Sequence, residues 1–183
     1  SRLWRHGRPV FLTASGKPAI DYDLNVLQEI ASVLDERLDA IERQIESGAE
    51  ADWYGDTAEG FCGVGFVACQ QYIVATASWL KVGKGTALGC GPVHPCGDTV
   101  ASIVNHAANF WKHRDEWVLG NSHGPQAKTE EGLESILPDF DKDYSLTNIL
   151  ANLLPPSKKW RFGELIPLLV DWRDDLNAKY PRG

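Results

Sequence analysis

The sequence predicts an all-α fold, a bundle of long helices with shorter helices towards the carboxyl end. Apolar residues recur at alternating steps of three and four from Leu24 to Ile45, the pattern of one long amphipathic helix. Residues 61–80 carry no charge over a length that suits a buried helix. No segment alternates apolar and polar residues as a half-buried strand would. We therefore expect a single helical domain over residues 21–183, after an irregular basic arm at residues 1–20.

The expected arm is basic and contains residues that break regular structure, namely Pro9, Gly16 and Pro18. The whole chain is acidic, with a formal net charge of -7, because residues 21–59 hold twelve acids against two arginines. This balance excludes a nucleic-acid footprint over the whole surface, which would be basic. The arm alone could touch a phosphate backbone, but a solvated terminus is the simpler interpretation.

The first predicted helix begins after a capping aspartate, either Asp21 or Asp23, and ends at Gly48. Its heptad spacing favours packing along another long helix of the same chain. Self-association as the seam of a dimer is the alternative.

The second predicted helix extends from about Thr57 to about Leu80. Its uncharged part is long enough to span a bilayer, but Gln70 and Gln71 would lie near the bilayer centre, where polar groups are costly. The expected interpretation is a helix buried in a bundle, with no membrane association.

A loop rich in glycine and proline is expected between Gly83 and Pro95, and a third helix follows a cap at Asp98 or Thr99. The remaining chain predicts three shorter helices, bounded by prolines and glycines, at residues 129–137, at residues 145–154 and from about residue 162 onwards.

The third helix holds the best candidates for a catalytic site. His106, Asn109, His113 and Glu116 recur at i, i+3, i+7 and i+10, so a helix would place them on one face, with Lys112 beside them. Histidine transfers protons near neutral pH, and a lysine stabilises developing negative charge. Such a set suits metal-free cleavage of a phosphodiester by a ribose hydroxyl. Structural roles for both histidines are the alternative.

The segment from Asn105 to Trp117 resembles the motif region of HEPN (higher eukaryotes and prokaryotes nucleotide-binding) domains. These are all-α domains of toxins and antiphage systems, and many are metal-independent endoribonucleases that act as dimers. The resemblance implies that His113 is the acid–base group, that Asn109 and Lys112 stabilise the phosphate, and that the remaining stripe residues, His106 and Glu116, orient them. The family's signature arginine has no counterpart at its usual spacing before the histidine.

A second candidate site lies in the Gly/Pro-rich loop, where Cys90, His94 and Cys96 are candidate zinc ligands within seven residues. Zinc prefers four such ligands, and the fourth would come from elsewhere in the chain: Cys62, Cys69, His106 or His123. The paired C-x2-C spacing of recognisable zinc sites is missing, and a plain rigid loop also explains these residues. Zinc is the one candidate cofactor.

The cluster Lys158-Lys159-Trp160-Arg161 has two interpretations, a phosphate contact or the charged start of a helix, and we prefer the second. The chain starts without a secretory pattern, so its four cysteines are expected to be reduced in the cytoplasm.

Two classes of function follow from the sequence. The first is a HEPN-like toxin or defence protein that cleaves or binds RNA and forms a homodimer. The second is a non-catalytic interaction or regulatory domain that dimerises through its long helices or binds a partner protein.

Overall fold

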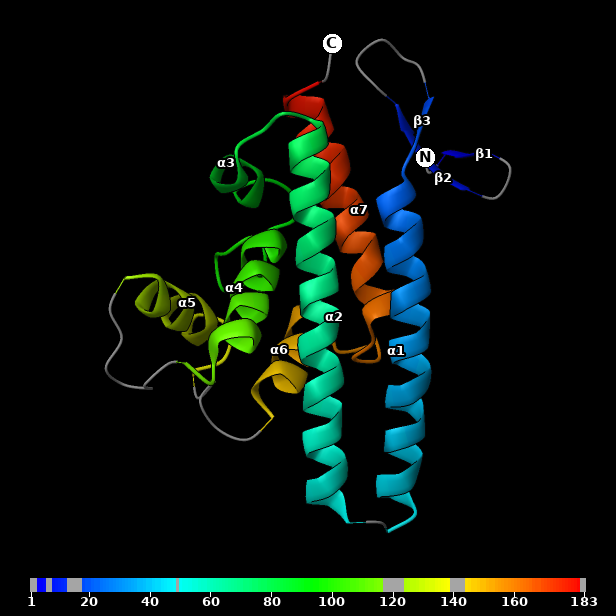
Figure 1. Ribbon diagram of the computed structural model, residues 1–183, viewed down its shortest axis with the longest axis vertical. Coiled ribbons are helices and arrows are strands. Elements are labelled where there is room, and N and C mark those ends of the chain that lie inside the picture. The colour runs from blue at the N-terminus through cyan, green and yellow to red at the C-terminus, as the bar shows by residue number, and fades with distance from the viewer. Residues whose placement is uncertain are drawn as a thin grey trace.

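The structure is a computed structural model that describes residues 3–5, 8–12, 18–48, 50–116, 124–138 and 144–181. Two long helices, α1 (Tyr22–Glu46) and α2 (Ala51–Trp79), form an antiparallel hairpin that extends over most of the molecule (Figure 1). Helix α7 (Phe162–Lys179) packs along α1 and also contacts α2. The predicted all-α bundle is confirmed.

Four shorter helices complete the bundle. Helices α4 (Val100–His113) and α6 (Ser145–Leu153) pack against α2, and α5 (Pro125–Glu134) packs on α4. These three lie on the side of α2 away from α1 (Figure 1). Helix α3 (Lys84–Leu88) is a short helix inside the predicted loop, where the glycines concealed it from sequence reasoning.

The amino-terminal arm differs from the prediction, because it contains three short strands. Strands β1 (Leu3–Arg5), β2 (Arg8–Leu12) and β3 (Pro18–Ile20) form an antiparallel sheet in that order. Strands of three to five residues are too short to show a clear alternation of apolar and polar residues, which is why the pattern did not reveal them.

The heptad seam of α1 is buried inside the chain's own bundle. Six of its seven residues are at most 6% exposed, on a helix that packs against α2 and α7: Leu24, Leu27, Ala31, Leu34, Leu38 and Ile41. The last, Ile45, is 39% exposed. The predicted cap is Asp21, whose Oδ1 accepts a hydrogen bond from the backbone N–H of Leu24 at 2.9 Å. The seam thus packs along other long helices of the same chain, as its heptad spacing favoured.

Helix α2 begins six residues before the predicted Thr57 and contains glycines where other helices approach closely. A Cβ at Gly63 would lie 2.0 Å from the Trp111 ring of α4, and one at Gly65 would lie 2.1 Å from the Phe162 ring of α7. These glycines lower helix propensity but allow two aromatic rings to contact the α2 backbone.

Carboxylates of the long hairpin cap the later helices. Asp35 of α1 accepts hydrogen bonds from the backbone N–H groups of Phe162 and Gly163 at the start of α7, each at 2.8 Å. Glu59 of α2 accepts bonds from the N–H groups of Leu146 and Thr147 at the start of α6, at 2.8 and 3.0 Å. The hairpin therefore fixes where α6 and α7 begin, because helix amino termini attract negative charge.

Candidate functional site

Three polar residues of α4 converge on one glutamine of α2. The side-chain amide of Gln70 donates to Asn105 Oδ1 at 2.8 Å and to Asn109 Oδ1 at 2.9 Å. Lys112 Nζ donates to Gln70 Oε1 at 2.8 Å. Gln70 and Asn105 are buried, so these bonds satisfy polar groups that would otherwise be costly inside the bundle.

Two of the predicted catalytic residues, Asn109 and Lys112, make structural contacts in this cluster. Asn109 and Lys112 do lie together, as predicted, but both bind Gln70 rather than an open site. Desolvation lowers the pKa of Lys112, and the nearby ammonium of Lys84 lowers it further. From the sequence, Gln70 is only a polar residue unsuited to the centre of a membrane. Its partners are 35 to 42 residues away in the chain, so no local pattern could identify them.

His113 is the last residue of α4, and Glu116 follows beyond the helix end. His113 Nδ1 and Glu116 Oε2 are 3.2 Å apart, and the two side chains are 46% and 72% exposed. A carboxylate beside one imidazole nitrogen can orient the ring, as in acid–base sites. The predicted pair is therefore brought together, at a solvent-exposed position.

The described neighbourhood of His113 contains one further stacked contact. The guanidinium carbon of Arg114 lies 3.8 Å from the centroid of the Trp111 ring, within cation–π range. Trp111 itself packs against α2 at Gly63. The last turn of α4 is basic through Lys112 and His113, which suits the negative carboxyl end of a helix, and the turn that follows holds Arg114, Asp115 and Glu116.

His106 lies apart from the other candidates, between α4 and α5. Its ring touches Gly132 of α5, where an added Cβ would be 2.5 Å from the imidazole Cδ2. Its Nδ1 atom is buried without a hydrogen-bond partner among the described residues. Burial lowers the pKa of this imidazole, against the opposing effect of the Asp98 carboxylate.

A polar cleft of about 370 Å³ opens beside His106. Its walls come from the start of α4, from α5 and from the residue after α5: Asp98, Lys128, Glu131, Gly132 and Ser135. Ser135 Oγ donates to Asp98 Oδ2 at 2.9 Å, so the hydroxyl binds the carboxylate. The five predicted catalytic residues are thus divided among three places, the Gln70 cluster, the exposed end of α4 and this cleft.

The candidate zinc ligands are engaged in other contacts. His94 Nε2 lies 3.0 Å from the carbonyl oxygen of Asn152, and its Nδ1 accepts from the backbone N–H of Cys96 at 3.3 Å. Cys90 Sγ lies 3.4 Å from the carbonyl oxygen of Thr86. Within the ranges that the structure describes, no three His, Cys, Asp or Glu side chains are grouped as a metal site requires. These contacts match the alternative of a rigid hydrogen-bonded loop.

None of the four cysteines forms a disulfide bond. Cys62 and Cys69, two predicted sources of a fourth ligand, are fully buried in α2, and burial raises the pKa of Cys62 to about 12. His123, another predicted source, lies outside the described residues.

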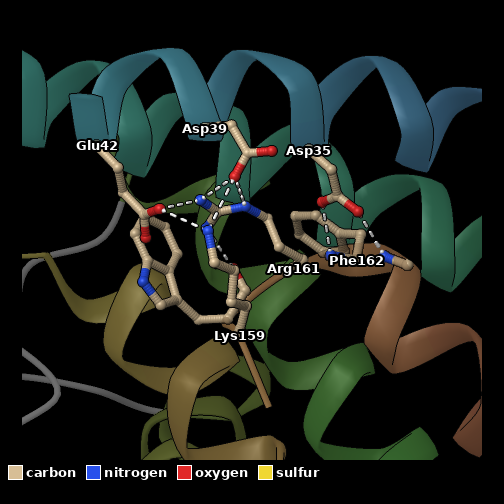
Figure 2. A network of polar contacts seen from close by, with 8 residues as sticks. Asp35, Asp39, Glu42, Lys159, Arg161 and Phe162 are labelled. Atoms are coloured by element: carbon tan, nitrogen blue, oxygen red, sulfur yellow. Dashed lines mark hydrogen bonds and ion pairs between the residues drawn. The ribbon is translucent and has the colours of Figure 1, made fainter. Parts of the chain in front are cut away.

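The basic cluster before α7 is used inside the fold. Figure 2 shows Arg161 reaching the acidic side chains of α1, where its guanidinium donates to Asp39 Oδ1 at 2.8 and 3.1 Å and also to Glu42. Lys159 Nζ lies 3.5 Å from both carboxylates. Arg161 is only 5% exposed, so it is unavailable to a phosphate backbone. The preferred interpretation of this segment, a charged helix start, fits these contacts.

One surface of the hairpin exposes apolar side chains from both helices, and we call these side chains together the hairpin face. On α1 it comprises apolar residues that are 36–64% exposed and spaced by three or four: Tyr22, Val26, Ile30 and Val33. On α2 its most exposed apolar members are Val64, Val74 and Trp79, at 36–49%. Residues 60–80 of α2 contain no charged side chain. The sequence showed both patterns, but it could not show which apolar residues the bundle leaves uncovered.

Of the described helices, α2 alone is long and apolar enough to cross a membrane, and 56% of its most apolar window is buried inside the protein.

Comparisons with protein families, curated proteins and solved structures find no match to this chain. The resemblance to HEPN domains therefore stays a prediction.

Proposed function

We propose that this chain is a non-catalytic helical interaction domain that forms a weak homodimer through the hairpin face. The observation that supports this proposal is the exposure of regularly spaced apolar side chains on two adjacent long helices. Single apolar residues are normal on a protein surface, whereas a row of exposed apolar residues along one helix is typical of an interaction site.

The composition of the face suits a second copy of the chain. With a net charge of -7, two copies repel one another over most of their surfaces, and this face places no charge of α2 in the contact. The face consists of two antiparallel helices, so a twofold rotation lays the α1 stripe of one copy against the α2 stripe of the other. Isologous dimers use this kind of self-complementary surface.

The area of the hairpin face indicates how tightly two copies would bind. At a rise of about 1.5 Å per residue, the α2 part from Val64 to Trp79 is about 22 Å long, and two packed helices are about 20 Å wide. Two such faces bury on the order of 900 Å² together, just below the area of about 1,000 Å² that specific interfaces exceed. We therefore expect a reversible dimer with a dissociation constant in the micromolar range.

Light scattering on a sizing column tests the dimer, with two matched variants. Val33 lies on the hairpin face and is 61% exposed, whereas Val93 lies in the loop before α4 and is 65% exposed. At concentrations of about 100 µM we expect the wild type and V93E to exceed the monomer mass of 20.2 kDa, and V33E to remain at it. Circular dichroism verifies that each variant is folded.

Two results would overturn the proposal. The first is a wild-type mass of 20.2 kDa at every concentration, and the second is an equal response of V33E and V93E. Co-sedimentation of a monomeric wild type with neutral phospholipid vesicles, lost in V33E, would instead assign the face to a lipid surface.

RNA cleavage is the second candidate function, and the His113–Glu116 pair is the observation that favours it. In that proposal His113 transfers the proton from an exposed position, with the Lys112 ammonium one residue away in the chain. Mixed RNA is incubated with the wild type and with H113A in the presence of a chelator. Cleavage by the wild type alone supports a metal-free nuclease, and intact RNA with both folded proteins removes it.

A further inference from the structure

Helix α5 is attached to the bundle chiefly through α4. Among the described helices, its packing contacts are concentrated on α4. The α5 residues that are buried include Thr129, Glu130 and Leu133. Any change that weakens the α4–α5 contact therefore acts directly on the docking of α5.

His106 lies within this contact. Its imidazole packs on the backbone of Gly132, at a distance that leaves no room even for a methyl group. Because Nδ1 is buried without a partner, the neutral ring already lacks one hydrogen bond. A protonated imidazole carries hydrogen on both ring nitrogens, so protonation would leave an unpaired N–H donor of a charged ring at this buried atom. The contact is thus built for the neutral imidazole.

We propose that α5 is docked by neutral His106 and is released from α4 when this imidazole takes up a proton. Release would expose the apolar residues of α5 and of the α4 face beneath it, and would open the cleft that these helices share. The device converts a pH change into the exposure of a buried surface.

The charged groups that face His106 come from three elements. Asp98 before α4 and Glu131 of α5 favour protonation, whereas Lys84 of α3 opposes it. Lys128 of α5 lies on the same cleft. Desolvation is the largest effect and lowers the pKa of His106 below the usual value of 6.5.

The sign of the pH effect follows from this direction. Well above pH 6.5, as at pH 7.5 and higher, the imidazole is almost entirely neutral in both the docked and the released states, so docking does not depend on its proton. As the pH falls below that value, the released state binds the proton more readily, and docking weakens until the docked imidazole is also protonated. The total change in the docking equilibrium equals the ratio of the two acid dissociation constants of His106.

Hydrogen exchange followed by mass spectrometry tests the release. Protection of the α5 peptide is measured at pH 7.5 and at pH 5.5, corrected for the intrinsic exchange rate, with the buried α1 peptide as internal reference. We expect the wild type to lose protection in α5 on acidification while α1 keeps it. H106Q is expected to lose this pH response, and H113Q, which changes the exposed histidine, is expected to retain it.

An NMR titration of the His106 ring makes the test quantitative, because the loss of protection must level off at the ratio that the measured constants give. If α5 does not dock in H106Q, that variant gives no information, and the wild-type titration together with the wild-type hydrogen exchange still tests the proposal. Unchanged α5 protection in the wild type between the two pH values overturns the proposal, as does an equal loss in H106Q. A His106 midpoint at or above 6.5 with α5 docked would do so as well.

Discussion

Replacing Arg161 by methionine should destabilise the protein by about 2 kcal/mol. Arg161 is almost fully buried, and its guanidinium donates to Asp39, to Glu42 and to the Trp160 carbonyl. Breaking a fully buried ion pair costs about 3–5 kcal/mol. The cost here is lower because the side chains of Asp39 and Glu42 are 42% and 25% exposed, so water can solvate them after the change.

The assay is thermal and urea unfolding followed by circular dichroism. For a domain of 183 residues, about 2 kcal/mol corresponds to a fall in Tm of about 4–8 °C. Lys159→Met is the matched control, since Lys159 contacts the same carboxylates at 3.5 Å from a side chain that is 68% exposed. We expect this control to change the unfolding free energy by less than about 0.5 kcal/mol.

A double-mutant cycle with Asp39→Asn isolates the pair and should give a coupling energy of about 1 kcal/mol. The hydrogen bond from Arg161 lowers the pKa of Asp39, so the contribution of the pair is present above the usual aspartate pKa and disappears as the pH falls below it. The difference between wild type and R161M should therefore shrink in acid. An R161M protein within about 0.5 kcal/mol of wild type, with no coupling to Asp39, would refute the structural role of the basic cluster.

Two further substitutions test how the hairpin fixes the later helices. Gly65→Ala should destabilise the fold by more than about 2 kcal/mol in urea unfolding, because its Cβ would lie 2.1 Å from the Phe162 ring, whereas Gly85→Ala, with open space around it, should not. Glu59→Gln weakens the cap of α6 and should cost about 1 kcal/mol in the same assay. An unchanged unfolding midpoint in either variant would contradict the contact that it tests.

The sequence predicted the helices whose periodicity is strong and missed the elements whose formation depends on distant contacts. The seam of α1, its cap Asp21 and the cap Thr99 of α4 follow from local patterns, and the structure places them as expected. The predicted start of α2 is six residues too late, because Gly55 lowers the helix propensity of its first turns. An added Cβ at Gly55 would lie 2.4 Å from the Tyr144 ring, just before α6. Such a contact joins residues that are far apart in the chain, so the spacing of residues in the sequence does not reveal it.

The candidate site shows the same limit. Polar residues at steps of three and four on a helix suit a catalytic face, but they suit a buried contact with a neighbouring helix equally well. Here Asn109 and Lys112 belong to the contact with Gln70, whereas His113 is exposed. The partner on α2, Gln70, distinguishes the two cases. It lies 39 and 42 residues from Asn109 and Lys112 in the chain, so no local sequence pattern identifies it.

The two proposals concern separate surfaces, and this separation makes each one testable without the other. The hairpin face lies on α1 and α2, whereas His106 lies between α4 and α5, which Figure 1 places on the side of α2 away from α1. A dimer formed through the hairpin face would leave α5 free to detach. The monomeric V33E variant should therefore keep the wild-type pH response of α5, because Val33 belongs to α1, and α5 lies on the side of α2 away from α1 (Figure 1). Loss of the response in V33E would mean that dimerisation and the docking of α5 are coupled through α2, whose Gln70 already connects the hairpin to α4.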